Sequence, residues 1–193
     1  MVEIDISTIT AEFTSDSDTL ADQAAQELAN LGSQNPEIFS QLLADSSMDV
    51  RWWTVRSLAG IDSPEAHSLL IHALDDPDIP VRQCAALALQ QQPVPRAIPA
   101  LVQTLGCADQ LLRRLAGDAL IAVGSDAVPD LIAVLQDGPQ ISRIEAARAL
   151  ALIADTRAVP ALFQALDEES AIMEHWAGEG LEKMGIGMVF YSP

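Results

Sequence analysis

The chain has 193 residues, of which 49% are hydrophobic and 4% aromatic, and it carries a formal net charge of −18 at pH 7. Ten basic residues against 28 acidic ones argue against nucleic acid as a partner, because binding a phosphate backbone depends on clustered Lys and Arg. The same balance disfavours an anionic membrane surface. With few aromatic residues, the core must be built from Ala, Leu, Val and Ile.

The composition also indicates a compartment. Cys84 and Cys107 are the two cysteines of a chain too large to need disulfides, so we expect reduced thiols and a cytoplasmic location. The N-terminal sequence MVEIDISTIT has neither the basic nor the apolar region of a signal peptide. No run approaches the length of a membrane-spanning helix, so we expect no membrane insertion.

The first elements in chain order are a leader and one helix. Residues 1–16 alternate apolar and polar side chains and are interpreted as a leader or a cap. Residues 17–31 place Ala21, Ala24 and Leu28 on one stripe and end at Gly32, with Asp16, Ser17 or Asp18 as the N-cap. This helix is predicted to be the second half of a repeat whose first helix is missing or degenerate.

A fixed period of about 31 residues organises the rest of the chain. Arg51, Arg82, Arg113, Arg143 and Glu174 follow one another at intervals of 31, 31, 30 and 31 residues. Each is preceded by a Leu eight residues earlier and followed by a small residue three later and a Leu seven later. Such a period is typical of stacked helix pairs. Five units are predicted, at 36–60, 64–91, 97–123, 127–153 and 158–184.

Prolines and short turns fit this division into helix pairs. Pro99, Pro129 and Pro160 belong at a first helical turn, where the missing N–H costs nothing, and Pro36 and Pro64 serve the first two units in the same way. An isolated helix of this length leaves an apolar stripe exposed to water, so stacking of neighbours stabilises it. Residues 17–184 are therefore predicted to form one solenoid. The tail, 185–193, breaks the pattern and is interpreted as a cap on the last repeat, with a docking tail as the alternative.

The repeats resemble short HEAT-like repeats of the phycobilin lyase type. The resemblance is carried by Val81–Arg82 with Ala85, Ala86, Ala88 and Leu89, by Arg143 with Ala146, Ala147, Ala149 and Leu150, and by Val159–Pro160 with Leu162 and Leu166. It covers about residues 36–184 and implies an all-α, armadillo-like α-α superhelix of five helix pairs plus an N-terminal half repeat. Members of the lyase group attach, detach or isomerise open-chain tetrapyrroles on light-harvesting proteins, often as a pair of repeat chains. Other members serve as binding partners in cofactor or complex assembly.

The repeated arginines have two interpretations. Arg51, Arg82, Arg113 and Arg143 either form an anion-binding ridge or form a structural ladder that pairs with turn groups such as Asp49, Asp78 and Asp137. We favour the ladder, because the planar fork of Arg suits paired acceptors better than Lys does.

A second set of residues lies on the side of the second helices opposite the core. At 100° per residue, offsets −1, +3, +4 and +7 from the ladder position point into the core, whereas +1, +5 and the border position +2 point away. In this repeat type the second helices line the concave side, so we expect one groove. Its residues, which we predict to bind a partner, are Trp52, Trp53, Arg56, Gln83, Leu87, Arg114, Asp118, Ile144, Arg148, His175, Trp176 and Glu179.

Two hypotheses for function follow. Trp and Arg dominate protein-binding hot spots, which favours a non-catalytic scaffold that holds a protein or peptide in the groove and needs no cofactor. The alternative is a bilin lyase-like or chromophore-handling protein, in which aromatic faces and Arg hold a tetrapyrrole and a second repeat chain takes part. His67 and His72, five residues apart, do not make a metal pair, and no recognisable catalytic motif occurs, so we lean against an enzyme. Cys84 at the groove border is interpreted as a small buried hydrophobe rather than a reactive thiol.

Overall fold

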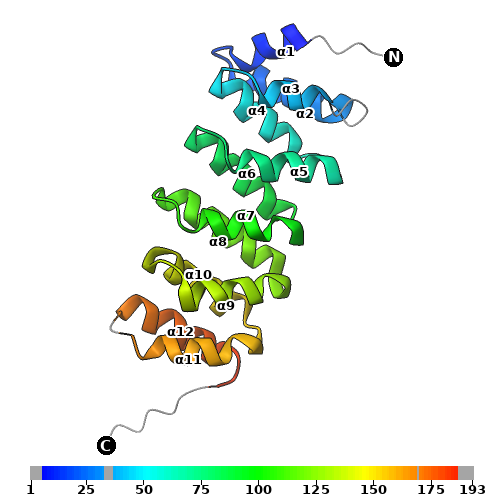
Figure 1. Cartoon of the computed structure of the whole chain (residues 1–193). Helices are drawn as coiled ribbons and strands as arrows, with labels where there is room; N and C mark the ends of the chain where they lie inside the picture. Colours follow the sequence, from blue (N-terminus) through cyan, green and yellow to red (C-terminus); the bar gives the residue numbers. More distant parts are fainter. Residues whose placement is uncertain (1–5, 33–36, 169, 187–193) are drawn as a thin grey trace, which may run out of the picture. The chain divides into compact units, whose positions relative to one another are not determined.

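The structure, a computed structural model, describes residues 6–32, 37–168 and 170–186. Over these ranges the chain forms twelve α-helices and three short 3-10 helices, in the order shown in Figure 1. The predicted all-α repeat architecture is confirmed. The helices group into two compact units, unit 1 (residues 1–92) and unit 2 (residues 93–193). None of the described helices has the length and hydropathy needed to cross a bilayer.

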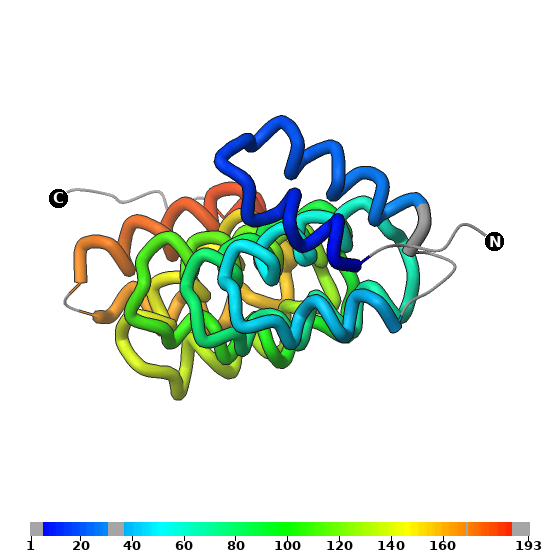
Figure 2. Tube along the Cα trace, turned by 90° about the horizontal axis from the view of Figure 1, so that it is seen from above, coloured from blue at the N-terminus to red at the C-terminus, as the bar shows by residue number. Residues whose placement is uncertain are grey.

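Unit 1 contains three antiparallel helix pairs. Its helices are α1 (Ile6–Phe13), α2 (Asp18–Gly32), α3 (Glu37–Leu43), α4 (Met48–Leu58), α5 (Pro64–Ala73) and α6 (Ile79–Gln91). The trace turns back between α1 and α2, drawn in blue in Figure 2. The second helices α2, α4 and α6 are neighbours in that order.

Unit 2 repeats the same arrangement, with short 3-10 turns leading into its first helices. These elements are η1 (Pro95–Ala97), α7 (Ile98–Thr104), α8 (Gln110–Val123), η2 (Gly124–Ala127), α9 (Val128–Asp137), α10 (Gln140–Ile153), η3 (Thr156–Ala158), α11 (Val159–Leu166) and α12 (Ala171–Lys183). The second helices α8, α10 and α12 are neighbours in that order. The five predicted units agree with the observed helix pairs.

The helices begin where the sequence supplies caps and prolines. Ser63 and Asp109 accept hydrogen bonds from the backbone N–H groups of Ala66 (3.1 Å) and Leu112 (2.7 Å). Each side chain thereby satisfies one of the donors that a helix start leaves open. One proline occupies the first or second position of each of α5, α6, α7, α9 and α11. Pro36 lies outside the described residues.

The core is made of small and aliphatic side chains at the predicted repeat positions. The small residues three positions after the ladder are fully buried: Thr54, Ala85, Ala116, Ala146 and Ala177. The Leu residues seven positions after it are buried as well: Leu58, Leu89, Leu120, Leu150 and Leu181. Small side chains let neighbouring helices approach closely, so burial of methyl and methylene groups supplies most of the stability.

Part of the predicted N-terminal leader is a helix. Residues 6–13 of the predicted leader form α1, whose Ile9 and Phe13 are buried, so the half repeat is a complete pair with a short first helix. The i, i+4 spacing of Ile9 and Phe13 is helical, but α1 has a surface to cover only because α2 and α4 supply one. The predicted tail lies outside the described residues from 187 onward.

Candidate functional site

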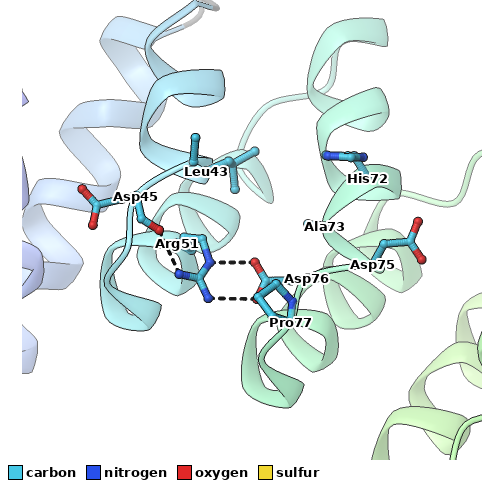
Figure 3. Close-up of a pocket in the computed structure, with 9 residues that line it drawn as sticks. Leu43, Asp45, Arg51, His72, Ala73, Asp75, Asp76 and Pro77 are labelled. Atoms are coloured by element: carbon cyan, nitrogen blue, oxygen red, sulfur yellow. Dashed lines mark hydrogen bonds and ion pairs between the residues drawn. The ribbon is translucent and has the colours of Figure 1, made fainter.

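Arg51 shows how the ladder position works in unit 1. Its guanidinium is buried and donates to Asp76 Oδ2 (2.8 Å from Nε) and Asp78 Oδ2 (2.5 Å from Nη2), both in the next repeat. It also donates to the carbonyls of Asp45 and Ser46, in the turn of its own repeat. The hydrogen bond to Asp76 raises the pKa of Arg51 above its ordinary value. Figure 3 shows Arg51 with Asp45 and Asp76 at a pocket of about 290 Å³.

The other ladder arginines bind their own turns in a similar way. Arg82 donates to the carbonyl of Asp76 (3.0 Å), and Arg113 donates to those of Cys107 and Ala108. Arg143 donates to the carbonyl of Leu135 (2.8 Å) and forms an ion pair with Glu168 of the following repeat. Asp76 and Asp78 thus pair with Arg51, and Glu168 pairs with Arg143. All of these donors serve the joints between helices, which is the arrangement of a structural ladder.

The predicted groove residues of unit 1 form an aromatic cluster with one cation. Trp53 stacks on Phe13 of α1 (ring centroids 6.1 Å apart), and Trp52 meets Trp53 edge-on at 4.8 Å. Both indoles are half-buried, so each packs against its neighbours on one side and contacts solvent on the other. Arg56 is half exposed and lies 3.6 Å from Asp22 of α2. The cluster thus has a usable guanidinium beside a partly accessible aromatic surface.

On α6, next to α4, the predicted residues differ in exposure. Leu87 is exposed, Gln83 is half-buried, and Cys84 is buried. Burial raises the pKa of the Cys84 thiol to about 11, although Arg56 acts in the opposite direction. A thiol with so high a pKa is a poor nucleophile near neutral pH. Its burial agrees with its interpretation as a small hydrophobe.

In unit 2, Arg148 is placed differently from the prediction. It is only 2% exposed, so it does not face a groove. Its Nη1 lies 2.8 Å from Asp118 Oδ1, its Nε lies 2.8 Å from Glu145 Oε2, and its Nη2 is 3.4 Å from the carbonyl of Arg114. The side chain leaves the outward face of α10 and folds into a notch over Gly117 on α8, which has no Cβ to exclude it. Arg148 is therefore a structural residue between two second helices.

The remaining predicted residues of unit 2 stay accessible to different degrees. Arg114 is half exposed and lies 3.5 Å from Asp118, which shares its carboxylate with Arg148. Ile144 is half-buried, and His175 is exposed and in ring contact with half-buried Trp176. Glu179 forms an ion pair with Lys183. All of them lie on α8, α10 and α12, and a partner-binding role for them stays a prediction.

A column of exposed aliphatic residues on these same helices was not predicted from the sequence. Leu111, Ile141 and Ile172 are 54%, 47% and 55% exposed, and each lies two residues before the ladder position of its helix. Offset −2 corresponds to 160° around the helix, between offsets +1 and +2, on the outward side. The same period that revealed the ladder could have found this column. We call these three residues, with Arg114, Ile144 and His175, the second-helix face of unit 2.

The described residues offer no metal centre, because no group of three or more His, Cys, Asp or Glu side chains among them is arranged to hold an ion. His67 is buried and lies 3.3 Å from Asp62. The outward faces of the second helices carry aliphatic groups, indoles and exposed guanidinium groups.

The fold and its repeat pattern place the chain in a family. It matches the HEAT repeats family over residues 35–121 and 128–186, and it belongs to that family. Within it, the chain is 39% identical over 97 residues to phycocyanobilin lyase subunit alpha of Synechococcus elongatus, across 46% of this chain and 35% of the relative. The corresponding subunit of Microchaete diplosiphon is 33% identical over 106 residues, across 48% of this chain and 35% of the relative. The resemblance to lyase-type repeats is thus confirmed.

Other relatives share the repeat without sharing one function. Deoxyhypusine hydroxylase of Rattus norvegicus is 30% identical over 116 residues, 58% of this chain and 38% of that protein. The matches span little more than a third of the length of these relatives.

Two solved structures illustrate the shared fold. The complex of CpcE and CpcF of phycocyanin lyase from a Nostoc species is 22% identical with a TM-score of 0.51, covering 96% of this chain and 79% of that one. A designed armadillo repeat protein in complex with the peptide (KR)4 is 20% identical with a TM-score of 0.52, covering 94% of this chain and all of the other. At these identities the likeness establishes the fold.

Proposed function

We propose that this chain is a non-catalytic protein-binding scaffold, and that the second-helix face of unit 2 holds a segment of its partner. The observation that carries the proposal is the column of Leu111, Ile141 and Ile172, three large aliphatic side chains exposed on neighbouring helices. An apolar side chain left in water contributes nothing to the free energy of folding. Apolar residues exposed together on one surface are typical of protein-interaction sites. Arg114 and His175, exposed on the same helices, add polar contacts that fix orientation.

The spacing of this column restricts the partner. Packed helices lie about 8–10 Å apart, so the three side chains form a row with steps of roughly that length. A helix offers apolar side chains at intervals of about 10 Å when they recur every seven residues. A segment in the polyproline II conformation does so every third residue, because it has three residues per turn and rises about 3.1 Å per residue. The expected partner segment therefore carries apolar residues at one of these two spacings.

Affinity capture from the native cell, read by quantitative mass spectrometry, tests the proposal. Ile141→Glu combined with Ile172→Glu should reduce retention of the principal partner by at least about tenfold, since interface cores dominate binding energy. Phe163→Glu is the matched control, because Phe163 is also exposed but lies on a first helix, α11. Equal retention by the double variant and the control would reject the proposal. Unchanged melting temperatures would show that the fold is intact.

A second candidate function is chromophore handling in the assembly of light-harvesting proteins, for which bilin is the ligand and a second repeat chain the partner. It is favoured by the identity of 39% to a phycocyanobilin lyase subunit. In unit 1, Trp52 and Trp53 supply partly exposed aromatic surface beside Arg56, whose guanidinium suits a propionate. Arg148 has no part in this candidate, since it is buried and already paired. A cytoplasmic location, where thiols stay reduced, belongs to both candidates.

An absorbance and fluorescence titration with free phycocyanobilin separates the two candidates. Chromophore handling requires a saturable spectral change that Trp52→Ala and Arg56→Ala, both in unit 1, each weaken. The control Arg96→Ala, at an exposed position in unit 2, should leave the spectral change unaltered. A flat titration curve would remove chromophore binding by this chain alone and leave the scaffold proposal in place.

A further inference from the structure

The flank of α12 that faces away from α10 is open in the described part of the chain. On α10, the residues four and eight positions after the ladder, Ala147 and Ala151, are fully buried, and Ala151 lies against Gly180 of α12. On α12 the equivalent residues are Gly178, which is half-buried, and Glu182, which is exposed. A pocket of about 420 Å³ occupies this flank. The flank is therefore the position at which a further helix would pack.

The pocket has the charge of a cation-binding surface. It is lined by Leu166, Ala171, Glu174, His175, Gly178, Glu179 and Glu182. Lys183 pairs with Glu179, and among the described residues no basic side chain is ion-paired with Glu174 or Glu182. Because Ala171 and Gly178 are small, another helix can pack close to this part of the pocket.

The ladder explains which charge a neighbour must bring. Arg51 donates forward to Asp76 and Asp78, and Arg143 donates forward to Glu168. At the same position α12 carries Glu174, so a negative charge stands where the earlier repeats have a positive one. A further repeat of the same kind would set its turn carboxylate against Glu174, which is repulsive. A second copy of this flank would likewise set Glu against Glu.

We propose that this flank docks a basic amphipathic helix of another protein, with an Arg or Lys of that helix at Glu174. The basic side chains pair with Glu174 and Glu182, and the small or apolar stripe of the helix rests on Ala171 and Gly178. The net charge of −18 attracts a basic partner and so increases its association rate. Salt screens this attraction and should lower the association rate. His175 borders both this surface and the second-helix face of unit 2, but Glu174, Gly178 and Glu182 lie outside that face, so the inference does not rest on the function proposed above.

Fluorescence anisotropy with the full chain and a labelled alanine-rich helical peptide that carries Arg along one face tests this inference. The chain should bind this peptide saturably, and the same peptide with Glu in place of Arg should not bind. Glu174→Arg should weaken binding at least about tenfold, the effect of losing a central contact. Glu65→Arg, an exposed change of the same charge in unit 1, is the matched control and should leave the Kd within about threefold.

A second variant separates site-specific binding from general attraction to an acidic protein. Gly178→Leu adds a side chain where a Cβ meets nothing within 4 Å, so it fills the pocket without disturbing the fold, and it should weaken binding as strongly as Glu174→Arg. Equal effects of Glu174→Arg and Glu65→Arg would overturn the inference. Failure of the full chain to bind the peptide would also overturn it, as would self-association that Glu174→Arg abolishes, because the occupant would then be a second copy.

Discussion

The guanidinium of Arg148 occupies the space that a side chain at Gly117 would need: a Cβ atom on Gly117 would lie 2.6 Å from Nη2 of Arg148. Glycine at this point of α8 is thus what allows an arginine on α10 to be buried between two helices. The two carboxylates beside it, Asp118 and Glu145, replace the water that Arg148 loses.

Gly117→Ala tests this relationship directly. Alanine in a helix interior normally stabilises a protein by about 0.5–1 kcal/mol relative to glycine. Here we expect a loss of about 1–2 kcal/mol, because the new methyl group expels Arg148 from its carboxylates. Urea denaturation measures the change. In an Arg148→Ala background the same substitution should become neutral or stabilising, and a coupling energy below about 0.5 kcal/mol would contradict the account.

Arg148 and Arg114 approach the same carboxylate but differ in burial. Arg148→Met should lower the free energy of unfolding by about 2–4 kcal/mol, because it leaves Asp118 and Glu145 without their buried cation. Arg114→Met, at a side chain that is 51% exposed, should cost less than about 1 kcal/mol. Chemical denaturation of both variants provides the comparison, and similar costs would show that the network is not a buried one.

The ladder in unit 1 predicts a large effect at Arg51. Arg51→Ala should destabilise the chain by about 3 kcal/mol, since it leaves Asp76 buried without its cation. Arg113→Ala removes hydrogen bonds to two carbonyls and should cost about 1 kcal/mol. Arg51→Lys, which keeps the charge but not the fork, should fall between them. A cost for Arg51→Ala no greater than that for Arg113→Ala would contradict this reading of the ladder.

Two glycines on α12 should respond to alanine with opposite signs. At Gly178 a Cβ meets nothing within 4 Å, so Gly178→Ala should stabilise the chain by about 0.5–1 kcal/mol. At Gly180 the Cβ would lie 2.9 Å from the Cα of Ala151, so Gly180→Ala should destabilise it by about 1–3 kcal/mol. Thermal unfolding of the two variants measures both changes in stability. Stabilisation by both would mean that α10 and α12 are less closely packed than described.

The two thiols should differ in reactivity. Burial raises the pKa of Cys84 to about 11, whereas Cys107 is half exposed, so alkylation at pH 8 should label Cys107 at least about tenfold faster. The folded thiol of Cys84 keeps its proton while the unfolded one loses it near pH 9, so the free energy of unfolding should fall between pH 9 and 11. Cys84→Ala should remove that part of the decline. Equal labelling of both thiols would contradict the burial of Cys84.

Much of the architecture was readable from the period alone. The 31-residue spacing located the ladder and the five later helix pairs, because each repeat must present the same small and aliphatic residues to its neighbours. The period failed at α1, whose short helix matches no repeat position and depends on the contact between Phe13 and Trp53.

Burial on the outward side of the second helices depended on the neighbouring helix. Leu87, Arg148 and Glu179 share offset +5, yet only Arg148 is buried. Four residues after the ladder position, the preceding second helix has Val55 in the case of Leu87 and Ala147 in the case of Glu179. In the case of Arg148 it has Gly117, which lies against the guanidinium. The sequence by itself determined which residues lie at the outward offsets, because helical geometry is local. Only the tertiary structure decided which of them remain exposed, because a side chain can fold between helices only where its neighbour leaves room.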